Sequence, residues 1–189
     1  MAGRAEILPL LAEVFRAHGY EGATLALLTQ ATGLGKGSLY HFFPGGKEQM
    51  ASEVLAEIDA WFDINVFRPL LNSDDPKRAI ADMLGCVEIY FRAGKRVCLV
   101  GVVALGASRD FFQQQVHGYF KRWDDALASA LRRAGDTPAS ARRKSKDALL
   151  SIQGALVLAR ALDDSKVFSC AMADLKLRLL GESRQWLKR

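Results

Sequence analysis

The 189-residue chain has few cysteines, no long hydrophobic run and no recognisable export signal. Its three cysteines, Cys86, Cys98 and Cys170, are too few and too scattered for a disulfide scaffold, and their odd number fits a reducing compartment. The longest apolar run, residues 97–107, is well short of the roughly twenty residues that a membrane-spanning helix needs. Because the first residues also lack the apolar core of a signal peptide, we expect a cytoplasmic protein without a membrane partner.

The residue patterns of enzymes and nucleotide-binding proteins are missing as well. The glycine-rich stretch 33–37 has the wrong glycine spacing for a dinucleotide fold, and its Lys36 is followed by glycine instead of the serine or threonine of a phosphate-binding loop. The histidines stand far apart, without cysteine or carboxylate at ligand spacing: His18, His41 and His117. No acid–base pair or catalytic triad stands out, so we predict no cofactor, no metal ion and no enzymatic activity.

The excess of positive charge lies in the second half of the chain. The formal net charge is +5, but residues 1–75 hold five basic and ten acidic side chains, whereas residues 76–189 hold twenty-one and eleven. The overall charge therefore does not indicate where nucleic acid would bind. The basic run at 142–146 is interpreted as a solvated helix face, with an anion or nucleic-acid site as the alternative.

Apolar residues recur at spacings of three and four along nearly the whole chain, and alternating strand-like runs are absent, so the sequence predicts an all-α fold. The first helix should end at Gly19, with Tyr20 folding back towards Phe15. Thr24 and Asp75 have side chains suited to capping the helices that follow them. Further helices are expected at about 24–32, 36–43, 47–68 (stopped by Pro69), 76–93, 98–108, 110–134, 138–163 and 165–180.

Residues 24–43 have the layout of a helix-turn-helix, in which a glycine turn joins two short helices. On the second helix Lys36 and Tyr40 share a polar face, and Leu39 with Phe43 points into the domain. The polar face offers donors to phosphates and base edges, and its glycine leaves room for the wall of a DNA groove. Thr24 and Lys47 lie at the expected N-termini of helices, which favour phosphates, and they complete the predicted DNA-binding set. The set is Thr24, Lys36, Gly37, Ser38, Tyr40, His41 and Lys47. A helical hairpin with a glycine turn is the alternative.

Residues 7–50 resemble the N-terminal DNA-binding domain of the TetR family of bacterial transcriptional regulators. The residues that carry the resemblance are Thr24, Gly33, Lys36-Gly37-Ser38-Leu39-Tyr40-His41, Phe43 and Pro44-Gly45-Gly46-Lys47-Glu48, which is similar to the LmrA/YxaF-type branch. A weaker likeness to this branch continues through residues 98–101 and through Phe120, Trp123, Leu127 and Leu131. Phe42 and Gly35 depart from the family pattern, so family contacts at these two positions are not carried over.

The resemblance implies a DNA-binding domain at residues 1–48 and a helical ligand-binding and dimerisation domain at residues 49–189. It further implies a homodimer that binds a pseudo-palindromic double-stranded DNA operator, as a repressor, and that responds to a small apolar or aromatic effector. A helical sensor or binding protein without specific DNA binding is the alternative, favoured by the acidic balance of residues 1–75 and by Phe42. An enzyme that uses a C-terminal cavity ranks last.

Long apolar and aromatic residues of the second half are candidates to line the effector cavity, although core packing is the competing role for each. These candidates are Met83, Val87, Tyr90, Phe91, Phe112, Val116, Tyr119 and Trp123, with Gln153 as a polar contact. The resemblance implies that apolar stripes on the last two helices form a four-helix dimer interface, through Leu149, Ile152, Leu156, Phe168, Met172 and Leu175. Cys98 is interpreted as a small buried residue, with redox sensing as the alternative.

Overall fold

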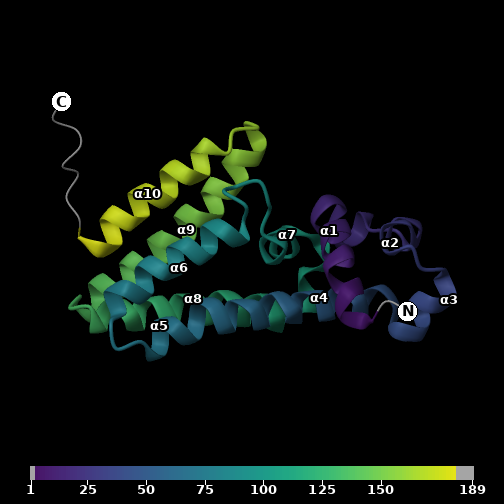
Figure 1. Cartoon of the computed structure of the whole chain (residues 1–189), viewed down its shortest axis with the longest axis horizontal. Coiled ribbons are helices and arrows are strands. Elements are labelled where there is room, and N and C mark those ends of the chain that lie inside the picture. The colour runs from purple at the N-terminus through teal and green to yellow at the C-terminus, as the bar shows by residue number, and fades with distance from the viewer. Residues whose placement is uncertain (1–2, 182–189) are drawn as a thin grey trace. The chain divides into compact units, whose positions relative to one another are not determined.

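The computed structural model describes residues 3–181, and its regular elements over this range are all helical (Figure 1), which confirms the predicted fold class. The first α-helices are α1 (Arg4–Gly22), α2 (Leu25–Thr32), α3 (Lys36–Phe42), α4 (Gly46–Phe62), α5 (Arg68–Asn72) and α6 (Pro76–Tyr90). The remaining ones are α7 (Leu99–Leu105), α8 (Gln113–Arg133), α9 (Pro138–Ala161) and α10 (Lys166–Leu180). A π-helix, η1 (Asp63–Phe67), precedes α5, and a 3-10 helix, η2 (Ala107–Phe112), precedes α8.

The chain divides into two compact units. The first contains the described residues up to Trp61 together with Cys98–Tyr119, and the second contains Phe62–Val97 together with the described residues from Phe120 onward. Helix α8 therefore begins in the first unit and ends in the second. The expected functional boundary after residue 48 remains a prediction, because compactness and function need not divide a chain at the same residue.

In the first unit, α1 packs against α2 and α7, and α2 packs against α3. The buried face of α1 includes Ile7 and Phe15, whereas Leu10 is 44% exposed because it lies beside that face. Gly19 has a φ of 67°, a conformation that favours glycine, and the chain kinks there. The kink lets the Tyr20 ring stack on Phe15 with 6.3 Å between the ring centroids, as the sequence indicated.

Two predicted capping residues hold the starts of their helices. Thr24 Oγ1 accepts a hydrogen bond from the Leu27 amide at 3.3 Å, and Asp75 Oδ1 accepts one from the Arg78 amide at 2.9 Å. Each bond satisfies an amide that has no partner within its helix. Gly33 ends α2 in the left-handed conformation, with a φ of 67°. These local interactions fix the two ends of the first helix in the helix-turn-helix.

The single long helix predicted for residues 47–68 is instead interrupted. Helix α4 ends at Phe62, the π-helix occupies Asp63–Phe67, and α5 continues over Arg68–Asn72. The prediction that Pro69 stops the helix is wrong, because the π-helix places Pro69 in the first turn of α5. A missing amide costs no intrahelical hydrogen bond in a first turn, so proline is tolerated there.

An aromatic cluster forms the centre of the second unit. The Phe62 ring centroid lies 4.8 Å from Tyr90, 5.2 Å from Trp123 and 6.2 Å from Phe91, and Phe168 of α10 lies 6.3 Å from Phe91. Helix α10 packs against both α9 and α6, and the three helices lie side by side in Figure 1. Tilted and edge-to-face ring pairs of this kind add to the stability gained from burial.

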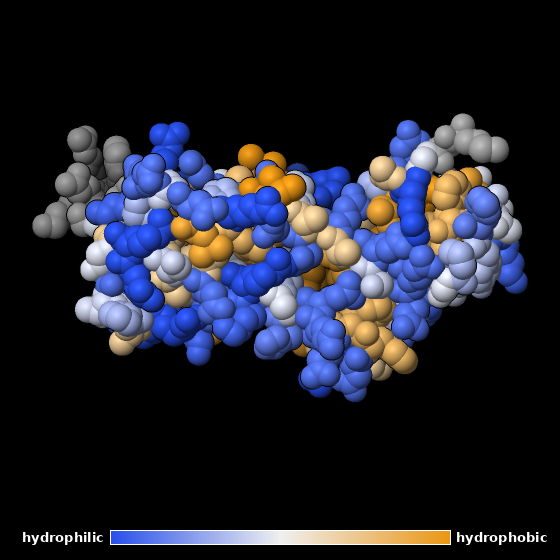
Figure 2. Space-filling model, turned by 90° about the horizontal axis from the view of Figure 1, so that it is seen from below, coloured by the Kyte–Doolittle hydropathy of each residue, from blue (hydrophilic) through white to orange (hydrophobic). Residues whose placement is uncertain are grey.

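No helix within residues 3–181 is both long enough and apolar enough to cross a membrane. Figure 2 shows one face of the protein, on which small hydrophobic areas alternate with hydrophilic ones. Several large apolar side chains of the chain are exposed, among them Ile64, Ile89, Leu105 and Phe111.

Candidate nucleic-acid interface

Helix α3 has an anchored face and a polar face. Leu39 and Phe43, the residue directly after the helix, are completely buried in the first unit. The predicted contact residues on the other face are all exposed to solvent: Lys36, Gly37, Ser38, Tyr40 and His41. These five positions are therefore accessible to solvent, and their contacts with DNA remain a prediction.

Gly37 has no packing reason to be glycine. A methyl group added at this position would meet no atom within 4 Å, and the backbone of Gly37 is helical. Glycine is a weak helix former compared with alanine, so its presence in the first turn of α3 gives the folded chain no advantage. The open space above this residue is a feature of the surface, and it leaves room for another molecule to approach the backbone.

The ring of Tyr40, the aromatic residue on this face, packs against the turn between α3 and α4. A Cβ atom placed on Gly46 would lie 3.4 Å from Cε1 of Tyr40, so the Tyr40 ring rests against the backbone where α4 begins. Gly46 has a φ of 66°, which favours glycine. The Tyr40 side chain is 43% exposed, so part of the ring remains available for contact.

The other two predicted contact residues lie where the sequence placed them, at the starts of helices. Thr24 is exposed and caps α2, while Lys47 is the second residue of α4. The Lys47 ammonium donates to the carbonyl oxygen of Tyr20 at 2.9 Å and lies 4.5 Å from the centroid of the Tyr20 ring. Lys47 thus ties α4 to the end of α1, and its predicted contact with a DNA phosphate remains a prediction.

The end of α1 also contacts η2, a connection that the sequence did not reveal. Glu21 Oε1 accepts a hydrogen bond from the amide of Ser108 at 2.7 Å, and the Tyr20 ring lies 5.2 Å from Phe112 in an edge-to-face arrangement. The bond to its own backbone amide, aided by Ser108 and by the charge of Lys47, lowers the pKa of Glu21 although burial acts in the opposite direction. Glu21 is therefore held as a carboxylate.

The residues predicted to line an effector cavity come from both units, and their common role remains a prediction. Three belong to the first unit, namely Phe112, Val116 and Tyr119, and six belong to the second, namely Met83, Val87, Tyr90, Phe91, Trp123 and Gln153. All except Tyr90 and Gln153 are buried, and Trp123 Nε1 lies 3.5 Å from Sδ of Met83 within the aromatic cluster. Gln153 Nε2 is buried and has no hydrogen-bond partner among the described residues.

The residues predicted to form the dimer interface lie mostly inside the single chain. Ile152 and Leu156 of α9, and Phe168, Met172 and Leu175 of α10, are buried within one chain, and Leu149 is half-buried. The apolar stripes of α9 and α10 pack against each other, and α10 also packs against α6. The five buried side chains are therefore not exposed to a second subunit in this conformation. The exposed apolar residues of α9 are Leu150, Val157 and Leu158, a second stripe at helical spacing that the sequence also displays.

The structure bears on two alternatives raised by the sequence, an anion or nucleic-acid site in the basic run at 142–146 and redox sensing by Cys98. In the basic run, Arg142 forms ion pairs with Asp124 at 2.9 Å and Asp125 at 2.8 Å, so part of its charge is neutralised within the chain. Cys98 is buried as expected, and its Sγ accepts a hydrogen bond from the Gly101 amide at 3.3 Å at the start of α7. Within residues 3–181, histidine, cysteine and carboxylate side chains form no group of three that is able to hold a metal ion.

Known proteins resemble this chain in both of its halves. Residues 7–54 match the family described as bacterial regulatory proteins, tetR family, and residues 76–174 match the transcriptional regulator LmrA/YxaF-like C-terminal domain. The HTH-type transcriptional regulator LmrA of Bacillus subtilis is 27% identical over 166 residues, which cover 86% of this chain and 88% of LmrA.

Two further proteins extend the comparison. The HTH-type transcriptional repressor AcnR of Corynebacterium glutamicum is 47% identical over 47 residues, 25% of this chain and 24% of AcnR. A cysteine mutant of the TetR family transcriptional regulator CifR, complexed with 26-bp double-strand operator DNA, has a similar fold with a TM-score of 0.75 and 24% identity, over 95% of this chain and 96% of CifR. These relatives are regulators of transcription and not enzymes. The chain belongs to the TetR family of bacterial transcriptional regulators, with a C-terminal domain of the LmrA/YxaF-like type.

Proposed function

We propose that the protein is a homodimeric repressor that binds a pseudo-palindromic operator through α3 of each subunit and is released by a small apolar or aromatic effector. The observation that carries the proposal is the exposed polar face of α3, anchored by Leu39 and Phe43 and left open at Gly37. AcnR is named a repressor, and CifR is complexed with operator DNA, which supports the same role here. In this proposal the protein acts in the bacterial cytoplasm, where its operator is.

Within the DNA-binding residues, we assign base contacts to α3 and phosphate contacts to the helix starts. Lys36, Ser38 and His41 are exposed and offer donors of different length, which suits the edges of bases in the major groove. Thr24 and Lys47 lie at helix N-termini, where amide groups and the helix dipole favour a phosphate. The phosphate contacts position α3, and the base contacts select the sequence.

Exposed histidines provide a matched test of this assignment. His41 lies on α3, and His117 lies on α8, where no DNA contact is proposed. We expect His41→Ala to weaken operator binding by about tenfold, the effect of losing one base contact, and His117→Ala to leave it unchanged. Fluorescence anisotropy with a labelled operator measures both. Equal effects of the two substitutions would contradict the assignment of α3 to the groove.

Dimerisation is part of the proposal because a helix of seven residues makes too few contacts to select an operator by itself. Two copies related by a two-fold axis read two half-sites. The surface that we assign to the dimer is the exposed stripe of α9, in which Leu150 is 71%, Val157 60% and Leu158 52% exposed. Burial of such side chains against a second copy stabilises the dimer by about 1.5–3 kcal/mol for each one fully buried.

A charged residue in this stripe tests the interface. We expect Leu158→Glu to shift the protein from dimer to monomer in sedimentation velocity, because the carboxylate would be buried without a partner. The matched control is Ile89→Glu on α6, which introduces the same charge at another exposed apolar position. A Leu158→Glu variant that sediments as a dimer would place the interface elsewhere.

For the effector, we propose that it enters the aromatic cluster of the second unit. Met83, Phe91 and Trp123 are packed there, so the side chains must separate when a ligand binds. Gln153 Nε2 is buried without a hydrogen-bond partner among the described residues, and we keep it as the polar contact of the proposed ligand, since a ligand oxygen would satisfy this donor. Phe112, Val116 and Tyr119 lie in the first unit, where Phe112 already packs against Tyr20, and the proposal does not use them.

Selection from a random pool of duplex DNA tests the function as a whole. The purified protein is incubated with the pool at about 0.15 M salt, where non-specific phosphate binding is weak, and the retained DNA is sequenced. We expect an inverted repeat, which then serves as the probe for effectors that release it. Recovery of no motif would refute specific DNA binding and favour a helical sensor, and an operator affinity that no apolar ligand changes would refute the proposed release.

A further inference from the structure

A polar cavity of about 510 Å³ lies in the second unit, near the end of α9. Its walls come from the loop after α6, the last turn of α9 and the loop between α9 and α10, and its polar lining consists of Lys95, Arg160, Asp163 and Ser165. None of the residues predicted to contact an effector is among the lining residues. The volume falls in the range of small-molecule sites.

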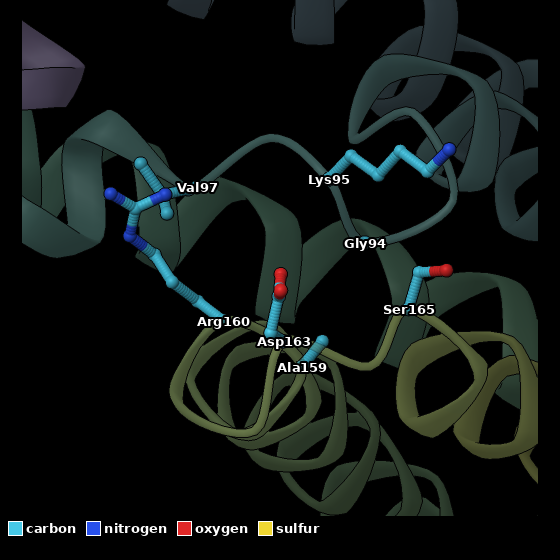
Figure 3. A pocket seen from close by; sticks show the side chains of 7 residues that line it. All are labelled: Gly94, Lys95, Val97, Ala159, Arg160, Asp163 and Ser165. Atoms are coloured by element: carbon cyan, nitrogen blue, oxygen red, sulfur yellow. The ribbon is translucent and has the colours of Figure 1, made fainter.

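The charged side chains of this cavity, Lys95, Arg160 and Asp163, are exposed to solvent. Figure 3 shows Arg160 and Asp163 extending from the end of α9 towards the loop that carries Val97 and Lys95. Among the residues that the structure describes, neither the two cations nor the carboxylate has an ion-pair partner within 4 Å. The lining therefore carries one net positive charge at a concave surface, where the local potential attracts an anion.

Backbone strain is concentrated in the same two loops. Within residues 3–181, the non-glycine residues with positive φ are Arg92 at 50°, Ala93 at 52° and Asp163 at 50°. Left-handed conformations cost roughly 1–2 kcal/mol each for residues with a Cβ atom, and they persist where the structure needs them, often at ligand sites. Asp163 follows the end of α9, a position that usually holds glycine, and aspartate is one of the few other residues that adopt this conformation.

We propose that this cavity binds a small organic anion, a carboxylate or phosphate that also carries a hydroxyl or amino donor. Figure 3 shows the Lys95 and Arg160 side chains extending to opposite sides of the cavity, so Arg160 binds the anionic group and Lys95 adds to the positive potential. The Asp163 carboxylate accepts a hydrogen bond from the donor. The Ser165 hydroxyl, which has no side-chain hydrogen bond at the start of α10, is free to join either group. The site is distinct from the aromatic cluster, because charged walls disfavour a wholly apolar ligand.

Two inorganic anions serve as probes of the full-length protein in isothermal titration calorimetry at pH 7 and constant ionic strength. Phosphate carries a hydrogen-bond donor at this pH, whereas sulfate does not, so we expect saturable binding with a preference for phosphate. Arg160→Gln, which removes the direct contact, should weaken phosphate binding about tenfold, and Lys95→Gln should weaken it less. Asp163→Asn should strengthen sulfate binding and reduce the preference for phosphate over sulfate. The substitution removes the negative charge that repels sulfate, an anion without a hydrogen-bond donor.

Arg132→Gln is the matched control, because Arg132 is an exposed arginine of α8 that does not line the cavity. The proposal is overturned if neither anion binds saturably, if Arg132→Gln weakens binding as much as Arg160→Gln, or if Asp163→Asn leaves the preference unchanged. The substituted side chains are charged and lack ion-pair partners in the described chain, so the variants should keep the melting temperature of the parent. No DNA is present in the titration, so its outcome is independent of operator binding.

Discussion

Substitution of Gly37 by alanine should separate the stability of the protein from its affinity for DNA. The added methyl group meets no atom within 4 Å, and alanine is the better helix former. Since Gly37 lies in the first turn of α3 and not in a helix interior, the expected gain in the free energy of unfolding is about 0.5 kcal/mol. A urea titration followed by circular dichroism measures this gain.

The same methyl group lies on the surface that faces the groove in the proposed complex. A closely packed contact that is forced to accept a methyl group loses about 1–3 kcal/mol. Two subunits meet the operator, so the loss is at least about 2 kcal/mol, or about thirtyfold in affinity. We therefore expect Gly37→Ala to be more stable than the parent protein and to bind the operator much more weakly in fluorescence anisotropy.

Gly85→Ala is the matched control for this experiment. Gly85 is an exposed glycine of α6, and a methyl group there also meets no atom within 4 Å. The control should gain stability and keep its operator affinity. If Gly37→Ala binds DNA like the parent, the reasoning that places this residue against the groove is refuted; if both variants lose affinity, the loss has another cause.

Two further predictions concern the stability of the folded chain. Gly94 and Gly135 both have positive φ, but only at Gly94 would an added Cβ atom collide with a side chain, because it would lie 2.6 Å from Cβ of Phe168. In urea titrations, Gly94→Ala should therefore lower the free energy of unfolding by about 2 kcal/mol more than Gly135→Ala. Equal losses would show that backbone conformation alone sets the cost. The lowered pKa of Glu21 means that its charged form stabilises the fold above the usual carboxyl pKa, and that this contribution is lost as the pH falls through the lowered value. Glu21→Gln should therefore weaken the acid dependence of the melting temperature below about pH 4.3, and identical acid profiles would contradict the role of the Ser108 contact.

Much of the DNA-binding region was predictable because its determinants are local. Thr24 caps α2 through an amide three residues away, and Gly33 ends that helix by its own backbone conformation. The division of α3 into a buried face with Leu39 and an exposed face with Tyr40 follows from helical periodicity alone. Interactions over three or four residues do not depend on the rest of the fold, so a sequence displays them directly.

The expected dimer interface shows where such reasoning stops. Helix α9 has two apolar stripes, one with Ile152 and Leu156 and one with Leu150 and Leu158, and both satisfy helical spacing. The structure buries the first stripe within the chain, where α9 packs against α10, and leaves the second exposed. Periodicity identifies apolar faces, but it does not state which face packs inside the chain and which remains for a partner.

The sequence by itself determined the helical class, the helix ends set by capping residues and the polar face of α3, because each depends on neighbours within one or two helical turns. Only the tertiary structure decided the hydrogen bond from Ser108 to Glu21 across 87 positions of the chain, the Lys47 contact with the end of α1 and the charged cavity beside α9. Such features arise when distant segments meet. Their geometry depends on how whole helices pack, which no local pattern encodes.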